Sequence, residues 1–138
     1  MDSLFRSIIT NKDVANLSNI FPNGGRYCLH ETLEDELHVM LIHAEPKNKY
    51  PKHKHTDTKE FYVILEGEMQ IDIWDPFGAR STIKMSTKKK SDVISFVVEK
   101  NTWHSTTAGP HGVKFFEFRS GPFVKENTIL ESKKNDKL

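Results

Sequence analysis

The sequence predicts an all-β fold, an antiparallel sandwich or barrel, behind a short helical segment. From residue 36 onward, apolar residues recur at every second position, which is the period of a strand with one buried face. Runs with this period follow one another at roughly even spacing with polar turns between them, as in antiparallel β architectures. The run Pro22-Asn23-Gly24-Gly25 stops any helix before them. These three observations place the helical part before this run and the β part after it.

Residues 3–20 have helical spacing in two pieces. Apolar residues fall at positions 4, 5, 8 and 9, and again at positions 14, 17 and 20. Asp13 is the expected N-terminal cap of the second piece. We therefore treat residues 1–21 as an N-terminal helical segment.

Six segments that follow the helical segment in the sequence have the pattern of β-strands. They alternate in polarity or are rich in β-branched and aromatic residues. They are ELHVMLIHA (36–44), FYVILE (61–66), MQIDIW (69–74), ARSTIKM (79–85), VISFVV (93–98) and VKFFEFR (113–119). Gly67 is expected to close the second of these strands. Asp75-Pro76-Phe77-Gly78 is a turn, and KKKSD (88–92) is expected to be a solvated hairpin loop rather than a phosphate-binding patch.

Composition argues against several function classes. The chain has 138 residues, which suits one domain. Its formal net charge of +1 gives no overall electrostatic attraction to nucleic acid or to a membrane surface. The single cysteine, Cys28, excludes an internal disulfide or a thiolate zinc cluster. No apolar run reaches the ~20 residues of a membrane helix, and the N-terminus lacks a leader-like pattern. We therefore expect a cytoplasmic protein with a small-molecule ligand and neither nucleic-acid nor membrane partners.

The stretch KYPKHKHTDTKEFYVILEG (49–67) holds metal-ligating side chains directly before a strand. His53 and His55 are two apart, so on an extended segment both imidazoles point to one side. Glu60 begins the next strand and can bring a carboxylate to the same point. His104 is a fourth candidate, on an alternating strand that could bury either face. Three imidazoles and a carboxylate suit Fe, Mn, Ni, Zn or Cu, whereas two histidines and the carboxylate alone would leave open positions for substrate or dioxygen.

Three further side chains are candidates for contact with a ligand. Arg26 can present a guanidinium to a carboxylate or phosphate, or is a surface residue at a strand start. Tyr62 alternates with a phenylalanine and is either a core residue or part of the substrate site. Glu117 faces either solvent or the interior, where it would be a partner of a metal ligand or a base. His38 and His43 lie on one strand at opposite parity, so one of them could line the cavity, but the expectation is that both are structural.

The metal-ligating stretch resembles cupin motif one, G-x5-H-x-H-x3-4-E-x6-G. His53, His55, Glu60 and Gly67 match it, and Lys47 stands where the motif has its leading glycine. The resemblance implies that both histidines and the glutamate are metal ligands.

The segment around His104 resembles cupin motif two, G-x5-P-x-G-x2-H-x3-N, with four replacements. Val93 replaces the first glycine, Glu99 the proline, Asn101 the second glycine and Ala108 the asparagine. Asparagine is the least costly replacement for glycine where the backbone needs a positive φ. A tight turn before His104 is therefore expected, and the resemblance makes His104 the fourth ligand.

Four stretches together are similar to the WbuC-type cupins, small single-domain proteins encoded among surface-polysaccharide (O-antigen) functions. They are RYCLH (26–30), the HKH run with Glu60, NTWH (101–104) and FFEFRSGPF (115–123). The resemblance implies a jelly-roll barrel (double-stranded β-helix) and one bound divalent transition metal (Fe, Mn, Zn or Ni). By family analogy it also implies a homodimer. We expect the barrel over residues 22–124 and a polar tail over 125–138.

Two functions from different classes remain open. The first is a metal-dependent enzyme acting on a small polar molecule such as a sugar or sugar derivative, by an isomerase- or epimerase-like proton shift. Its base would be Glu117 or a metal-bound hydroxide, and an iron-dependent dioxygenase is a variant. The second is a non-catalytic module that holds a small metabolite with the metal as an anchor. A polar cavity with a titratable group beside the metal would favour the enzyme.

Overall fold

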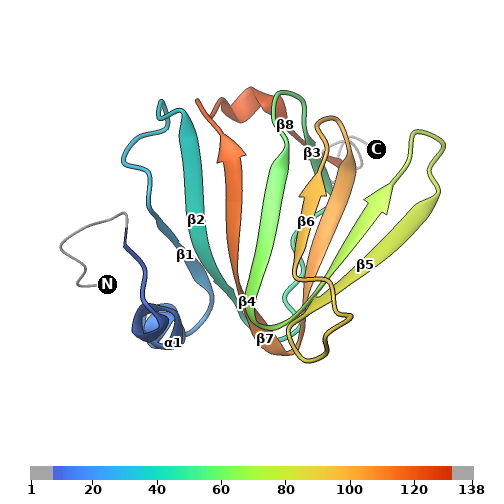
Figure 1. The fold of residues 1–138 in the computed structure, drawn as a ribbon. Coiled ribbons are helices and arrows are strands. Elements are labelled where there is room, and N and C mark those ends of the chain that lie inside the picture. The colour runs from blue at the N-terminus through green and yellow to red at the C-terminus, as the bar shows by residue number, and fades with distance from the viewer. Residues whose placement is uncertain (1–7, 132–138) are drawn as a thin grey trace.

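The computed structural model describes residues 8–131, which form a curled antiparallel sheet with one α-helix (Figure 1). The elements are α1 (Asn11–Ile20), β1 (Gly25–Cys28), β2 (Leu37–Ala44), β3 (His53–His55), β4 (Glu60–Trp74), β5 (Arg80–Ser86), β6 (Ser95–Val98), β7 (Trp103–Ser120), the 3-10 turn η1 (Lys125–Asn127) and β8 (Thr128–Leu130). All pairings between these strands are antiparallel, as predicted. Within the described residues, no helix has the length and apolar character needed to cross a membrane.

The helix α1 begins at a capping box. The Thr10 side chain accepts a hydrogen bond from the Asp13 N–H at 3.2 Å, and the Asp13 carboxylate accepts one from the Thr10 N–H at 2.9 Å. Thr10 is therefore the N-cap, and the prediction that Asp13 caps the helix is wrong by three positions. Lys114 of β7 donates to the Ala15 carbonyl at 3.2 Å and so ties the helix to the sheet. Residues 3–7 of the first predicted helical piece lie outside the described residues.

Two long strands organise the sheet. The predicted strands 61–66 and 69–74 are parts of one strand, β4, and the segments around His104 and Glu117 are parts of another, β7. β4 pairs with β5, β6 and β7, while β7 also pairs with β2 and β3. The loop 88–92 joins β5 to β6, which pair with β4 and not with each other. It is therefore a loop, as predicted, but not a hairpin.

Gly67 lies inside β4, so the prediction that it closes the strand is wrong. The pairing of β4 with β7 shifts register on both sides of Gly67. Gly67 has a φ of +85° and is paired with Val113, next to Gly112, whose φ is +83°. Such bulges increase the local twist of a strand. The register shifts place an irregularity of the β4–β7 pair at this glycine pair, and the sheet curls around its inner face (Figure 1).

The core fills the inside of this curl. One face of β2 carries His38, Met40 and Ile42 inward, whereas Leu37 on the other face is 59% exposed. The residues that form the buried apolar cluster are Met40, Ile42, Ala44, Tyr62, Ile64, Met69, Ile71, Met85, Val98, Ala108, Val113 and Phe115. This cluster fills part of the barrel, and the metal-ligating side chains lie near one edge of it.

The sheet extends beyond residue 124. β8 pairs with β3, with Thr128 opposite His55 and Leu130 opposite His53. Part of the predicted polar tail 125–138 therefore contributes a short strand. Residues 132–138 lie outside the described residues.

Candidate metal centre

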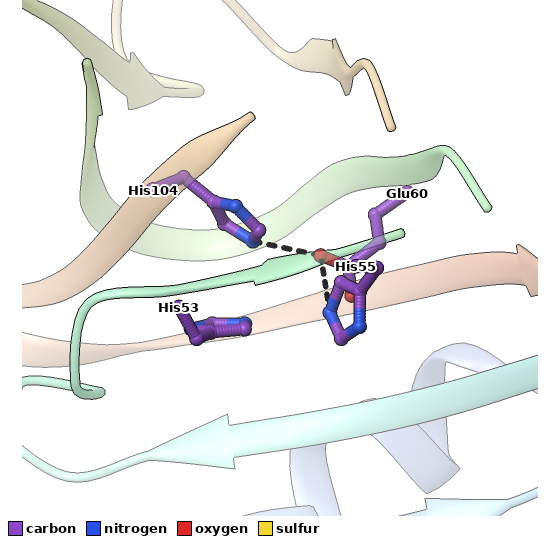
Figure 2. Close-up of side chains that lie close together, drawn as sticks. All are labelled: His53, His55, Glu60 and His104. Atoms are coloured by element: carbon purple, nitrogen blue, oxygen red, sulfur yellow. Dashed lines mark hydrogen bonds and ion pairs between the residues drawn. The ribbon is translucent and has the colours of Figure 1, made fainter. Parts of the chain in front are cut away.

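Three strands bring four metal-ligating side chains together (Figure 2). β3 supplies His53 and His55, β4 begins at Glu60, and His104 is the second residue of β7. β3 pairs with β7 at one position, which sets His53 directly opposite His104. One ligand atom from each side chain lies within 4.8 Å of the others. The structure thus brings together the four residues that the sequence predicts as ligands.

The outer nitrogen of each histidine ring has a partner away from the centre. His53 Nδ1 lies 2.7 Å from the Pro51 carbonyl, and His104 Nδ1 lies 2.8 Å from the Thr102 carbonyl. A carbonyl can only accept a hydrogen bond, so both Nδ1 atoms carry a proton. His55 Nδ1 lies 2.9 Å from the Thr128 hydroxyl of β8. These partners orient the rings, as the outer partners of metal-bound histidines do.

The inner nitrogens surround one carboxylate oxygen. Glu60 Oε1 lies 2.8 Å from His104 Nε2 and 3.1 Å from His55 Nε2, and it accepts a hydrogen bond from the Tyr62 hydroxyl at 3.2 Å. Burial acts to raise the pKa of Glu60, but the hydrogen bond from His104 and the nearby His55 outweigh it and hold the pKa well below its usual range. Burial, and then the proximity of His104, lower the pKa of His53 to about 4. Near neutral pH the site therefore offers an ionised carboxylate and a neutral imidazole at His53.

The donor set fits a divalent transition metal. His55 Nε2 is buried, is not aligned for a hydrogen bond to Glu60, and has no other hydrogen-bond partner among residues 8–131. Both nitrogens of His104 face oxygen acceptors, although a neutral ring donates only once. A cation bound at the Nε2 atoms would satisfy both rings. Two donors at ~2.0–2.2 Å from one ion are at most about 4.4 Å apart, so only a small closure of this group is required.

Two residues with a positive φ hold the loops around the site. Asn101, which stands for a glycine in motif two, has a φ of 62°, and its N–H donates to the His55 carbonyl at 2.7 Å. The expected tight turn before His104 is confirmed. Lys47, at the leading glycine of motif one, also has a left-handed φ, of 63°. Both positions where the motifs have glycine thus have a left-handed φ in this chain, although neither residue is a glycine.

A cavity of about 510 Å³ opens beside the metal-ligating group. Arg26, Tyr62 and Glu117 all line it, together with His53, His55 and Glu60. His104 lies behind this wall and is 1% exposed. The cavity brings the three predicted ligand-contacting residues to the same side as the candidate metal ligands.

Glu117 faces the interior rather than the solvent. It is paired with Met40 of β2 and Tyr62 of β4, both on the inner face of the sheet. Burial, followed by the charge of Glu60 and a hydrogen bond with it, raises the pKa of Glu117 well above its usual range. Burial also raises the pKa of Tyr62 well above 10. The opposite shifts of the two pKa values favour a proton on Glu117 and a charge on Glu60.

Three residues of the site were not predicted. Arg119 lines the cavity two positions after Glu117, and strand parity places both on one face. Tyr50 also lines it, and burial raises its pKa. Thr128 lines it from β8, in the part of the chain read as a tail. His43 lines the cavity too, but its Nδ1 is 2.8 Å from the Phe21 carbonyl.

His38 is outside the metal-ligating group, as predicted. Its Nε2 lies 3.1 Å from the Leu33 carbonyl, and its ring stacks on that of His30 at 4.0 Å between centroids. These contacts explain its burial without a metal.

His104→Gln is expected to weaken metal binding more than tenfold while the barrel still folds. The variant loses one of four donors, and the apolar cluster is untouched. Competition with a chelator of known affinity measures the change, and a circular dichroism spectrum checks the fold. Unchanged affinity in a folded variant would leave His53, His55 and Glu60 as a three-ligand site.

Comparison with known proteins gives a likeness of fold. A family model described as a domain of unknown function (DUF6016) matches residues 25–85, less than half of the chain. No curated protein matches the chain. An oxalate decarboxylase from Bacillus subtilis has a TM-score of 0.63 at 16% identity, over 79% of this chain and 28% of that one. A formate complex of the oxalate decarboxylase from Lactobacillus farciminis has a TM-score of 0.62 at 18% identity, over 81% of this chain and 32% of that one.

A third similar structure is CapF with the inhibitor 3-isopropenyl-tropolone. Its TM-score is 0.66 at 14% identity, over 78% of this chain and 31% of that one. The chain spans less than a third of the length of these three proteins. Such low identities show the fold alone, and that fold is the cupin barrel. The predicted fold class is confirmed: this chain has the cupin fold, with a group of three histidines and one glutamate that could hold a metal ion.

Proposed function

We propose that the chain is a metal-dependent enzyme that shifts a proton in a small polar metabolite, in the manner of an isomerase or epimerase. The position of Glu117 carries the proposal. Its carboxyl group lines an open cavity beside four metal-ligating side chains and is not itself one of the four. A closed structural metal site has no use for such a group, whereas proton transfer requires one.

His53, His55, Glu60 and His104 would hold the metal. The candidates are Fe, Mn, Zn and Ni, which imidazole and carboxylate ligands suit. Mn(II) centres are described for the oxalate decarboxylase of Bacillus subtilis, which has the same fold. When bound, the ion supplies Lewis acidity toward a carbonyl or hydroxyl oxygen of the ligand.

Glu117 would hold and return the proton. Its raised pKa favours the protonated carboxyl group, which is hydrogen-bonded to Glu60. The charges of Arg119 and Arg26 act in the opposite direction and favour the ionised form. A proton released from a Glu117 oxygen to the ligand therefore leaves a carboxylate that nearby positive charge stabilises. The same carboxylate can take a proton from another position of the ligand, which an isomerisation requires.

Glu117→Gln is expected to lower the rate of proton exchange by ~100-fold or more, because a general acid or base contributes ~10²–10⁴-fold. The assay incubates the metal-loaded chain in D₂O with a panel of sugars and sugar acids and follows loss of carbon-bound hydrogen by NMR. Metal content should not change in this variant. Glu99→Gln is the matched control, because Glu99 is exposed and, within residues 8–131, pairs only with Lys59 at 3.4 Å.

Other results of the same assay would contradict the proposal. Binding of a panel member without any deuterium incorporation would support a non-catalytic binding module. Consumption of dioxygen would support the iron-dependent dioxygenase. Full activity in Glu117→Gln would remove Glu117 from the mechanism.

A role in surface-polysaccharide biosynthesis belongs to this proposal. It is supported by the similarity of four stretches, including FFEFRSGPF (115–123), to the WbuC-type cupins. A sugar or sugar derivative would then be the substrate. The homodimer and the cytoplasmic location stay predictions.

A further inference from the structure

Arg119 has a guanidinium group whose Nε atom has no hydrogen-bond partner in the part of the chain that the structure describes. It lies on the inner face of β7, where it is paired with His38 of β2 and with Glu60 of β4. Its Nε atom is buried and has no hydrogen-bond partner among residues 8–131. The guanidinium carbon lies 4.6 Å from the centre of the Phe123 ring. The stacked ring fixes the plane of the group, and the Nε–H edge remains unsatisfied.

Arg26 adds a second positive charge to the same cavity. Within residues 8–131, neither Arg26 nor Arg119 forms an ion pair with a carboxylate. Among the described residues, Arg26 donates only to the Met40 sulfur at 3.5 Å, and a thioether is a weak acceptor. Both arginines line the cavity and act on the pKa of Glu117, but Glu117 does not pair with either. Two cationic groups therefore line the cavity that also holds the Glu60 carboxylate, and within residues 8–131 neither forms an ion pair with it.

We propose that the cavity binds a small molecule through a carboxylate, which an N–H edge of the Arg119 guanidinium receives and which the charge of Arg26 attracts. A planar guanidinium presents two parallel N–H groups along this edge, which match the two oxygens of a carboxylate. A buried N–H that has no protein partner is satisfied when such an oxygen arrives.

The pairing of strands sets this carboxylate site beside the candidate metal centre. Arg119 and Glu60 are cross-strand partners, and both face the cavity. A ligand with its carboxylate on Arg119 can therefore reach the metal-ligating group and Glu117 with the rest of its polar atoms. The substrate class is then a sugar acid or another polyhydroxylated acid, and this assignment rests on the proposed enzyme function.

The test follows the arginine Nε–H groups by ¹H–¹⁵N NMR in the full chain loaded with Zn²⁺. The signal of Arg119 is assigned by its absence in Arg119→Lys. The probes are acetate, D-glucuronate, D-glucose and inorganic phosphate. Glucose is the neutral match of glucuronate. We expect acetate and glucuronate to shift the Arg119 signal to saturation, and glucose to leave it in place.

The variants separate this site from other anion sites. Arg119→Gln should raise the dissociation constant of glucuronate at least tenfold. Because this variant lacks the Arg119 signal, binding is measured through another NMR signal of the cavity, such as that of the Tyr62 ring. Arg119→Lys keeps the charge without the paired N–H edge and should fall between this variant and the unchanged chain. Arg80→Gln is the matched control, because Arg80 is exposed and lies outside the cavity. Its affinity for glucuronate should equal that of the unchanged chain.

Three results would overturn the inference: no shift of Arg119 by either carboxylate at tens of millimolar, unchanged affinity in folded Arg119→Gln, or a shift by phosphate alone. Zinc content, measured on the same samples, separates this outcome from failure of the proposed function. Carboxylate binding at Arg119 without bound zinc would contradict the enzyme and keep the inference. Normal zinc content without carboxylate binding would contradict the inference and leave the proposed enzyme function standing.

Discussion

His55→Ala and His53→Ala each leave the purified chain with almost no metal, while the unchanged chain keeps its full content. This result is expected because each substitution removes one of four donors whose atoms lie within 4.8 Å of one another. The described residues offer no spare donor in this group, because His38 and His43 are held by the Leu33 and Phe21 carbonyls. Elemental analysis of protein purified without added metal measures the loss.

His111→Ala is the control for this experiment. His111 is an exposed histidine on β7, and it is not part of the metal-ligating group. Its removal leaves this variant with the same total number of histidines as His53→Ala and His55→Ala, and it should leave the metal content unchanged. Full occupancy in both His53→Ala and His55→Ala would show that the four residues do not hold the metal.

Local spacing predicted the first three candidate ligands, because His53, His55 and Glu60 lie within eight residues of each other. His104 lies 44 residues after Glu60 and depended on a resemblance, since its strand could have buried either face. The curl of the sheet determines which face of the strand is buried. Because strands distant in the sequence form this curl, the alternation of apolar and polar residues around His104 does not predict it.

Thr128 and Arg119 show what sequence patterns miss in this chain. Thr128 contacts His55 from β8, a strand of three residues in a polar segment. Such a short strand exists only because β3 offers its edge, so its own sequence does not predict it. Arg119 shares the parity of Glu117 and could have been inferred once Glu117 was placed inside. Parity alone does not say which face is inside.

The largest expected effect on stability is that of Gly67→Ala. Gly67 has a φ of +85°, where an alanine costs ~1–2 kcal/mol relative to glycine. A Cβ at this position would also overlap the Gly112 carbonyl oxygen and lie 3.1 Å from Val113 Cα. Both contacts are with the backbone of β7, so no side chain can move aside. Relief would require β4 and β7 to separate at this irregularity of their pairing.

Gly78→Ala separates the two causes. Gly78 has nearly the same φ, +87°, but a Cβ there would meet no atom within 4 Å. This control measures the conformational cost alone, ~1–2 kcal/mol, which corresponds to a fall in Tm of a few degrees in a chain of this length. Gly67→Ala should lose at least ~3 kcal/mol, a large part of the ~5–15 kcal/mol that stabilises an ordinary domain, and its Tm should fall by about 10 °C or more. Thermal unfolding followed by circular dichroism compares the two variants directly. Equal losses would mean that β4 and β7 have room at this position, and the steric account of Gly67 would then be wrong.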